Sequence, residues 1–456
     1  MELKKYNANH TQVLKINQIV RTISETHKFD KDKLIAINTS DVENGVMGNG
    51  TLTFVDELKG QFKKTIVKDD ILFSEIRPAN RRFAKVTTKN TKDYVVSTKL
   101  MVLRKYNEDV DLEYFYYCLT NQPFLDILQR RAENRIGSFP QITFDLLSEY
   151  AFPIPPISEQ KRISSVISTL DKKIALNRQI NQNLEAMAKQ LYDYWFVQFD
   201  FPNENGRPYK SFGGKMVWNE KQRKYIPEYW EVKSLSNWLE IKSGFPFKSE
   251  TYKPIGRYKI ITIKNVQDGE LVTSGCDYVN DIPSRAKDYI SLQIGDRLIS
   301  LTGNCGRLCV VCEENLLLNQ RVGLLCCDAI YLEYFYNFLN SGTMRTVIDN
   351  LANGAAQANL SPVELCKTDC FIPPIDILLS YNRKVNAIRK AIVQNNQEIS
   401  QLAKQRDELL PLLMNGQVSV NSDLSQYERE AFGFITITSL FQNKIYKNQI
   451  MFIPTI

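Results

Sequence analysis

The sequence FPIPPISEQKRISSVISTLDKKIALNRQINQNLEAMAKQL, residues 152–191, passes from a proline-rich loop into a long amphipathic pattern. After the double proline, apolar residues recur every three or four positions, which is the spacing of one face of an α-helix. The stretch therefore predicts a helix over about 158–197, with Ser158 as its N-cap. The apolar face consists of Ile163, Val166, Ile167, Leu170, Ile174, Ile180, Leu184, Met187 and Leu191.

A second copy of this pattern occupies residues 371–410, FIPPIDILLSYNRKVNAIRKAIVQNNQEISQLAKQRDELL, and without gaps its residues align with those 218 positions earlier, so that Phe371 aligns with Pro153. Pro373 corresponds to Pro155, and Asp376 takes the expected N-cap position of Ser158. The copy therefore predicts a second long helix over about 376–414. Its apolar face consists of Val385, Ile388, Ile392, Ile399, Leu402, Leu409 and Leu413.

The residues before each long helix are also duplicated. DLEYFYYCL at 111–119 matches YLEYFYNFL at 331–339, and ILFSEIRPANRRFAKV matches RLISLTGNCGRLCVV. A period of more than two hundred residues indicates duplication of a whole domain. Short runs bounded by Gly, Asn, Asp and Pro predict strands, and the LEYFY segments predict helices, so each domain is expected to be α+β. The expected strands are 64–68, 71–74, 83–87 and 94–103 in the first copy, and 258–263, 297–301, 308–312 and 320–326 in the second.

The predicted organisation has five parts. Two mixed domains, 1–152 and 201–372, alternate with two long helical segments, 153–200 and 373–416, and a tail of unknown structure follows at 417–456. At about 1.5 Å per residue, each helix is a rod of about 60 Å.

Each helical seam carries a mid-helix asparagine, Asn177 in the first and Asn395 in the second. A buried asparagine needs a polar partner, as in coiled coils where it fixes the register. We expect the two helices to pack together with these asparagines meeting, in either a parallel or an antiparallel pair. The alternative is that each helix packs only on its own domain.

Composition and motifs exclude several kinds of function. The chain has 58 Lys and Arg against 51 Asp and Glu, so its net charge of +7 is compatible with a polyanionic partner. It lacks a membrane-length apolar run and an N-terminal signal pattern, which makes the cytoplasm the expected location. It also lacks GxGxxG and GxxxxGK[ST] loops, and IPPI is not the Asn-Pro-Pro-aromatic motif of amino-methylating enzymes.

Three further groups of residues have side chains capable of chemistry. A metal-dependent nuclease would need clustered acids near a lysine, and Asp69, Asp70, Glu75 and Lys85 fit this only in the first copy. Eight of nine cysteines lie between 276 and 370 without paired CxxC spacing, so they are expected to be free core thiols rather than zinc ligands. His10 and His27 are expected at the surface.

The ordered set PIPPISEQKRI, DYWFVQFDFPNENGRPY, GGKMVW, IPEYWEV, IPPI and LLPLLMNGQV resembles the specificity subunits of type I restriction-modification systems, over residues 1 to about 420. The resemblance implies two target-recognition domains, each reading half of a split DNA sequence, and an antiparallel coiled coil that separates them. It also implies double-stranded DNA, two modification subunits and restriction subunits as partners. S-adenosylmethionine, ATP and Mg would be used by those subunits, and this chain would be non-catalytic with no cofactor of its own.

Two departures from the family pattern stand out. The second copy has Ile377-Leu378 where the first has Glu159-Gln160, and the tail after about residue 421 has no counterpart.

Contacts to DNA should combine phosphate-neutralising cations with side chains that reach base edges. We expect them mainly in SEIRPANRRFAK and in its counterpart LTGNCGR. The candidates are Lys64, Arg77, Asn80, Arg81, Arg82, Lys85, Arg130, Arg131 and Arg135 in the first domain, and Lys248, Lys253, Arg257, Lys264, Thr302, Asn304 and Arg307 in the second.

Two other classes of function remain open at this point. One is a coiled-coil adaptor that holds protein partners without binding DNA. The other is an autonomous nuclease or methyltransferase with an unfamiliar site.

Overall fold

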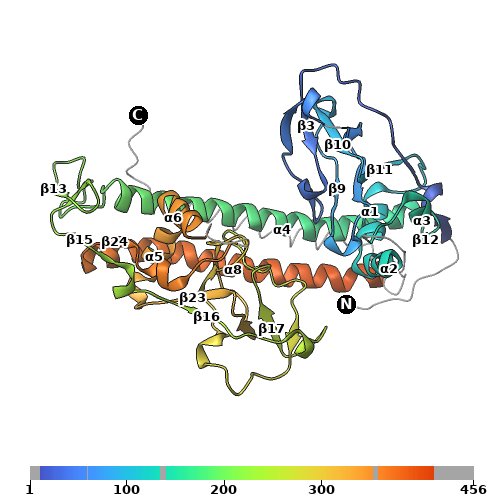
Figure 1. Cartoon of the computed structure of the whole chain (residues 1–456). Helices are drawn as coiled ribbons and strands as arrows, with labels where there is room; N and C mark the ends of the chain where they lie inside the picture. Colours follow the sequence, from blue (N-terminus) through green and yellow to red (C-terminus); the bar gives the residue numbers. More distant parts are fainter. Residues whose placement is uncertain (1–10, 59, 134–139, 353–357, 415–456) are drawn as a thin grey trace. The chain divides into compact units, whose positions relative to one another are not determined.

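The computed structural model describes residues 11–58, 60–133, 140–352 and 358–414, which form two compact units. The first unit comprises Met1–Asp171 and Ala403–Ile456, and the second comprises Lys172–Leu402. Figure 1 shows the two longest helices, α4 (Ile157–Tyr192) and α8 (Ile375–Met414). Each of them contributes one part to each unit. A short π-helical turn, Asp193–Val197, follows α4.

The first unit contains two four-stranded sheets with orders β6-β3-β10-β7 and β2-β11-β8-β9, and two-stranded ladders β1-β12 and β4-β5. Three helices, α1 (Leu112–Thr120), α2 (Gln122–Glu133) and α3 (Phe144–Ser148), follow the sheets. The strands are β1 (Gln12–Lys15), β2 (Val20–Thr22), β3 (Lys33–Ile37), β4 (Val42–Glu43), β5 (Val46–Met47), β6 (Thr51–Phe54), β7 (Phe62–Lys64), β8 (Ile71–Ser74), β9 (Phe83–Lys85), β10 (Tyr94–Ser97), β11 (Leu100–Lys105) and β12 (Ala151–Ile154).

The second unit repeats the two four-stranded sheets as β18-β17-β22-β19 and β16-β23-β20-β21 and the ladder β1-β12 as β15-β24, whereas its ladder β13-β14 has no counterpart in the described part of the first unit. Its helices are α5 (Ala329–Leu339), α6 (Gly342–Ala352) and α7 (Pro362–Cys366). The strands are β13 (Met216–Asn219), β14 (Lys224–Pro227), β15 (Glu231–Ser234), β16 (Glu240–Ser243), β17 (Tyr258–Ile261), β18 (Tyr278–Val279), β19 (Ser291–Leu292), β20 (Arg297–Ser300), β21 (Leu308–Val310), β22 (Leu316–Leu318), β23 (Val322–Cys326) and β24 (Asp369–Ile372).

Pairing directions confirm the duplication. In each first-named sheet one parallel pair, β3 with β10 or β17 with β22, lies between antiparallel neighbours. The other sheet is antiparallel throughout in both units. The α+β class and the repeated domain are therefore both confirmed.

The two long helices run antiparallel where they pack on each other. Within the second unit, Asn177 donates a hydrogen bond to Glu398, while Glu185, further along α4, pairs with Arg389, which comes earlier on α8. Within the first unit, Asp171 accepts from Arg406 over 2.9 Å, and Ile163 and Ile167 share a core with the last turn of α8. The alternative in which each helix packs only on its own domain is wrong.

The expected meeting of Asn177 with Asn395 is also wrong. Asn395 Nδ2 donates to Asn181 Oδ1 over 2.9 Å, and Asn181 Nδ2 donates to Asn396 over 2.7 Å. Asn177 binds Glu398 instead, over 2.9 Å. A position near the middle of each helix does not determine which residues meet, because a shift of one helical turn selects a different partner.

Both long helices begin one residue before the expected caps, at Ile157 and Ile375, so Ser158 and Asp376 are not N-caps. The carbonyl of Pro156 accepts from the N–H of Gln160 over 3.1 Å, and that of Pro374 accepts from Leu378 over 3.2 Å. A proline at this position can still accept the first hydrogen bond of the helix through its carbonyl.

Gln160 explains the departure between the two copies. It is fully buried, its Oε1 accepts from the N–H of Asp111 over 2.7 Å, and its Nε2 donates to the carbonyls of Asp109 and Pro155. The equivalent Leu378 is fully buried in the apolar core of the second unit. Each residue therefore matches the polarity of its surroundings.

Replacing Gln160 by leucine should destabilise the first unit by about 2–4 kcal/mol, because buried groups of the 109–111 loop and Pro155 lose their partners. Denaturant unfolding measures the change. The exposed neighbour Lys161 changed to leucine is the control, expected within about 0.5 kcal/mol of the wild type. Equal stability of Gln160→Leu and the control would contradict this account of the motif.

Candidate nucleic-acid interface

Two equivalent turns follow equivalent strands. The first turn, residues 75–82, links β8 to β9, and the second turn, residues 301–307, links β20 to β21. In the first, the N–H of Arg77 donates to Pro140 over 3.0 Å and the carbonyl of Glu75 accepts from Ile142 over 2.8 Å.

The second turn repeats these bonds. The N–H of Gly303 donates to Ala358 over 2.9 Å, and the carbonyl of Leu301 accepts from Leu360 over 2.7 Å. Each turn is therefore held at a fixed place against the segment that precedes the third helix of its domain.

The two turns have left-handed residues at similar positions, although the first turn has eight residues with a 3-10 helix at Pro78–Asn80 and the second has seven residues without one. Arg77 and Arg81 have φ of 46° and 54°, and their counterparts Gly303 and Gly306 have 75° and 78°. Left-handed backbone is easily adopted by glycine and costs other residues roughly 1 kcal/mol or more. The first turn thus carries arginines where the backbone favours glycine, and backbone strain of this kind collects at functional sites.

Arg81 and Arg82 tie the first turn to neighbouring parts of the first domain by hydrogen bonds. Arg81 Nε donates to Asn44 over 2.8 Å and Nη1 to Gln122 over 2.5 Å, while Arg82 Nη1 donates to the carbonyl of Ser40 over 3.0 Å. Burial, followed by repulsion from the Arg406 guanidinium, lowers the pKa of Arg81. Both side chains are half-buried. They hold the turn in place rather than presenting a free charge.

Arg77 and Asn80 are the exposed polar members of the first turn. Helix α2 lies directly beside them, because the N–H of Ala79 donates to Gln129 Oε1 over 3.0 Å. Arg130 and Arg131, on the last turn of α2, are exposed as well. We call Arg77, Asn80, Arg130 and Arg131 the first exposed cluster. Arg135 lies outside the described residues.

Two other lysine candidates of the first domain have internal roles. Lys64 Nζ donates to the carbonyls of Thr98 and Leu100 over 3.0 and 2.7 Å, and burial lowers its pKa. Lys85 forms an ion pair with Glu113 on α1. Neither is on the first exposed cluster.

The second turn presents fewer charges. Thr302 is buried and donates to Asn359 over 3.1 Å, whereas Asn304 is exposed. Arg307 Nη1 donates to Gln267 over 2.5 Å, and Gln267 donates to the carbonyl of the exposed Lys264 over 2.9 Å. We call Lys264, Asn304, Arg307 and the neighbouring Gln267, which sequence patterns gave no reason to choose, the second exposed cluster. Within it Arg307 and Gln267 are half-buried, and Arg307 Nε lies 3.9 Å from Asp268 Oδ2.

The remaining candidates of the second domain lie in a separate loop. Lys248, Lys253 and Arg257 are exposed in the segment after β16, which a backbone bridge between Lys253 and Tyr278 ties to β18. The Arg257 guanidinium stacks 5.0 Å from the ring of Tyr258. Among the described residues, no hydrogen bond links Lys248, Lys253 or Arg257 to the second turn.

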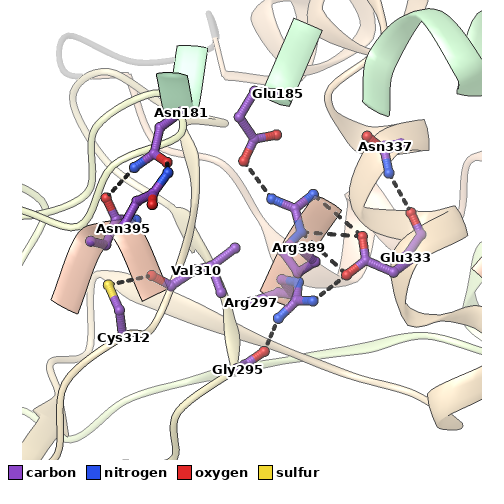
Figure 2. A network of polar contacts seen from close by, with 11 residues as sticks. Asn181, Glu185, Gly295, Arg297, Val310, Cys312, Glu333, Asn337, Arg389 and Asn395 are labelled. Carbon is purple, nitrogen blue, oxygen red and sulfur yellow. Dashed lines mark hydrogen bonds and ion pairs between the residues drawn. The ribbon is translucent and has the colours of Figure 1, made fainter. Parts of the chain in front are cut away.

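A buried charge network fixes the second domain on the long helices (Figure 2). Arg389 of α8 binds Glu333 of α5, with Nε 3.3 Å from Oε1, and pairs with Glu185 of α4. Arg297 of β20 pairs with Glu333 as well. Burial alone would raise the pKa of Glu333, but the guanidiniums of Arg389 and Arg297 outweigh it and lower that pKa. Glu333 therefore remains ionised in the core.

The residues considered for metal chemistry have other positions. Asp70 binds the guanidinium of Arg104 through both oxygens at 2.8 Å, so it is not part of an open acid cluster with Asp69 and Glu75. Cys309 and Cys312 are buried free thiols, and burial raises their pKa values. Over the described residues, no group of three or more His, Cys, Asp or Glu side chains is placed to hold a metal ion.

His27 is buried, so its expected surface position is wrong. Its Nδ1 accepts from the N–H of Phe29 over 2.9 Å, and its Nε2 lies 3.0 Å from the carbonyl of Lys92. These bonds make it a local brace. His10 lies outside the described residues. No described helix is long and apolar enough to cross a membrane.

The fold and the paired turns define a duplicated protein with two similar domains on two long helices. The model of the type I restriction modification DNA specificity domain matches residues 10–186. The HindI specificity subunit of Haemophilus influenzae is 29% identical over 454 residues, covering 88% of this chain and 98% of that one. The chain belongs to the family of type I restriction-modification specificity subunits, the non-catalytic subunits that give such systems their DNA specificity.

Further similar proteins carry the same description. The MjaIX specificity subunit of Methanocaldococcus jannaschii is 26% identical over 318 residues, covering 68% of this chain and 69% of that one. The crystal structure of the S subunit from M. genitalium is 16% identical with a TM-score of 0.47, covering 91% of this chain and 99% of that one.

Replacing Arg77 by glycine should leave the stability of the first unit unchanged or raise it by up to about 1 kcal/mol, since the left-handed backbone is relaxed. Replacing Gly303 by arginine, the reverse change, should destabilise the second unit by about 1 kcal/mol. Thermal unfolding of both variants measures the effects. Strong destabilisation by Arg77→Gly would contradict the view that the left-handed backbone of Arg77 is strained.

Proposed function

We propose that the chain reads a two-part, asymmetric DNA sequence, with one half recognised by each domain. The observation that carries this proposal is the pair of turns, which share backbone bonds and left-handed positions but differ in length and in exposed side chains. A shared frame with different exposed residues suits two readers of different sequences, because loops can change without altering the fold.

The first exposed cluster combines the two kinds of contact that DNA recognition needs. Arginine binds phosphate, or the O6 and N7 of guanine, and asparagine binds adenine through its amide. Arg77, Arg130 and Arg131 supply the cations, and Asn80 supplies the amide. In the second exposed cluster Lys264 and Arg307 supply charge, while Asn304 and Gln267 supply amides. The second reader would thus depend less on charge than the first.

The long helices are proposed to set the separation of the two half-sites. In this proposal equivalent domain attachments would lie at opposite ends of the antiparallel pair, and a continuous α4 and α8 would act as a spacer. In this proposal the five-part division of the chain, 1–152, 153–200, 201–372, 373–416 and 417–456, describes reader, spacer, reader, spacer and tail.

Catalysis is proposed to come from partner subunits in the cytoplasm. Two modification subunits would transfer methyl groups from S-adenosylmethionine, and restriction subunits would use ATP and Mg. The chain's own part is to bind DNA and to hold these partners.

Methylation mapping of DNA exposed to the chain together with its modification subunit tests the proposal. In a variant with Arg77→Ser and Asn80→Ser, one half of the methylated sequence should become degenerate while the other half and the gap stay unchanged. A matched variant of two exposed residues away from the turns, Lys28→Ser and Lys89→Ser, should keep the full sequence. Loss of both halves, or of neither, would contradict the assignment of the first turn to one half-site.

A further inference from the structure

A two-stranded hairpin joins α4 to the second domain and presents an uncovered face. Strands β13 and β14 pair antiparallel, with Val217 opposite Ile226 and Trp218 opposite Tyr225. Ile226 is buried in the core of the second unit and Val217 packs against that core. Because alternate residues of a strand point to opposite faces, Trp218 and Tyr225 lie on the outer face.

This outer face is aromatic and exposed. The exposed fractions of Trp218 and Tyr225 are 48% and 58%, and their rings meet edge to face with centroids 5.1 Å apart. Tyr229, just after the hairpin, is 76% exposed. A two-stranded hairpin gains little stability alone, and an aromatic face left in water is typical of a binding surface. Tryptophan and tyrosine are also the residues that contribute most at protein interfaces.

The hairpin segment is strongly basic. Residues 206–227 contain six cations, Arg207, Lys210, Lys215, Lys221, Arg223 and Lys224, and a single acid, Glu220. Lys215 and Lys221 are paired with Glu228 and Asp369, and burial lowers the pKa of Lys224. Among the described residues, Arg207, Lys210 and Arg223 form no ion pair. The charge that remains favours an acidic partner.

The face is distant from the second exposed cluster along α4. The loop that carries Gln267 is attached to α4 through an ion pair of Glu270 with Arg178 at 3.3 Å. The hairpin is attached beyond the end of α4, where Lys224 Nζ donates to the carbonyl of Val197 over 3.4 Å. Nineteen residues separate these two points of attachment, which corresponds to roughly 25–30 Å of helix. The hairpin is therefore a separate surface from the second turn.

We propose that this hairpin docks the modification subunit, through a surface on that subunit where carboxylates surround an apolar recess for the two rings. Phosphates would neutralise the cations but would leave the aromatic pair in water, so a protein surface fits better than DNA. The inference rests on the proposed function. Methyl transfer takes place on a base within the sequence being read, so the subunit that carries it out must lie against a reading domain.

The test measures the affinity of full-length chain for the purified modification subunit. Trp218→Ser with Tyr225→Ser should weaken binding roughly 30-fold or more, which is the effect of losing an interface hot spot. Lys210→Glu with Arg223→Glu keeps the rings, and should weaken binding roughly 10-fold or more and reduce its salt dependence.

Matched controls change exposed residues of the same unit outside the hairpin. Ile255→Ser with Ile294→Ser, and Arg285→Glu with Lys287→Glu, should leave the affinity within about twofold of the wild type. All variants should have the melting temperature and the DNA affinity of the wild-type chain.

The outcomes separate this inference from the proposed function. Wild-type affinity for the modification subunit in both hairpin variants would overturn the inference, while a two-part methylated sequence would leave the proposed function intact. If the hairpin variants lost DNA binding in the absence of the modification subunit, the hairpin would be assigned to DNA and the inference would be overturned as well. If the hairpin variants changed only the self-association of the chain, the hairpin would be assigned to contact with a second copy of the chain, and the inference would again be overturned.

Discussion

Replacing Arg389 by methionine is expected to destabilise the second unit by about 3–5 kcal/mol, the usual effect of breaking a buried ion pair. Arg389 lies between Glu333 and Glu185, and its guanidinium also stacks 4.5 Å from the ring of Tyr336. Methionine would fill much of the volume but would leave the buried Glu333 to the single remaining Arg297 and the half-buried Glu185 without its ion pair. Hydrogen exchange of the backbone in α5 and in the first half of α8 measures the loss.

Lys390 provides the control for this prediction. It is the next residue on α8 and is exposed, so Lys390→Met should stay within about 0.5 kcal/mol of the wild type. If Arg389→Met were no less stable than Lys390→Met, the network would not be what holds the second domain on the helices.

Removing the three cations of the first exposed cluster, Arg77, Arg130 and Arg131, is expected to weaken DNA binding roughly 10- to 100-fold near physiological salt. Each neutralised phosphate releases counterions, so the slope of log affinity against log salt should also fall by about 1 for each phosphate that is no longer neutralised. Fluorescence anisotropy with a DNA duplex over a salt series measures both effects.

The matched control removes three exposed cations from other loops of the same domain, Lys28, Lys68 and Lys89. Both triple variants have the same net charge, so only the position of the charges differs. Equal affinity and equal salt slope in the two variants would remove the first exposed cluster from the DNA interface.

The long-range plan of the molecule was predictable because it is repeated in the sequence. The two long helices and the two LEYFY helices occupy the expected places, since apolar spacing of three and four sustained over many residues fits a helix and not a strand. The bounds of the short strands were predicted less accurately. Residues 94–103 form two strands, β10 and β11, in different sheets, and only the first residue of 64–68 belongs to a strand.

The details that depend on pairing in space were not predictable. Nothing in the sequence relates Arg297, Glu333 and Arg389, although a glutamate inside the apolar run YLEYFYNFL was a signal that a buried cation should face it. His27 gave no such signal. Sequence also could not separate Arg81 and Arg82, which hold the first turn in place, from the exposed Arg77. Their hydrogen-bond partners, Asn44 and Gln122 for Arg81 and Ser40 for Arg82, are distant in the sequence.

The most direct test of the two-reader account is the pattern of methylated bases in DNA modified by the wild-type chain and its modification subunit. The account predicts one sequence with two specific parts that differ from each other, separated by a gap of constant length in which any base is accepted. A continuous sequence without a gap, or a palindrome with two identical halves, would contradict it.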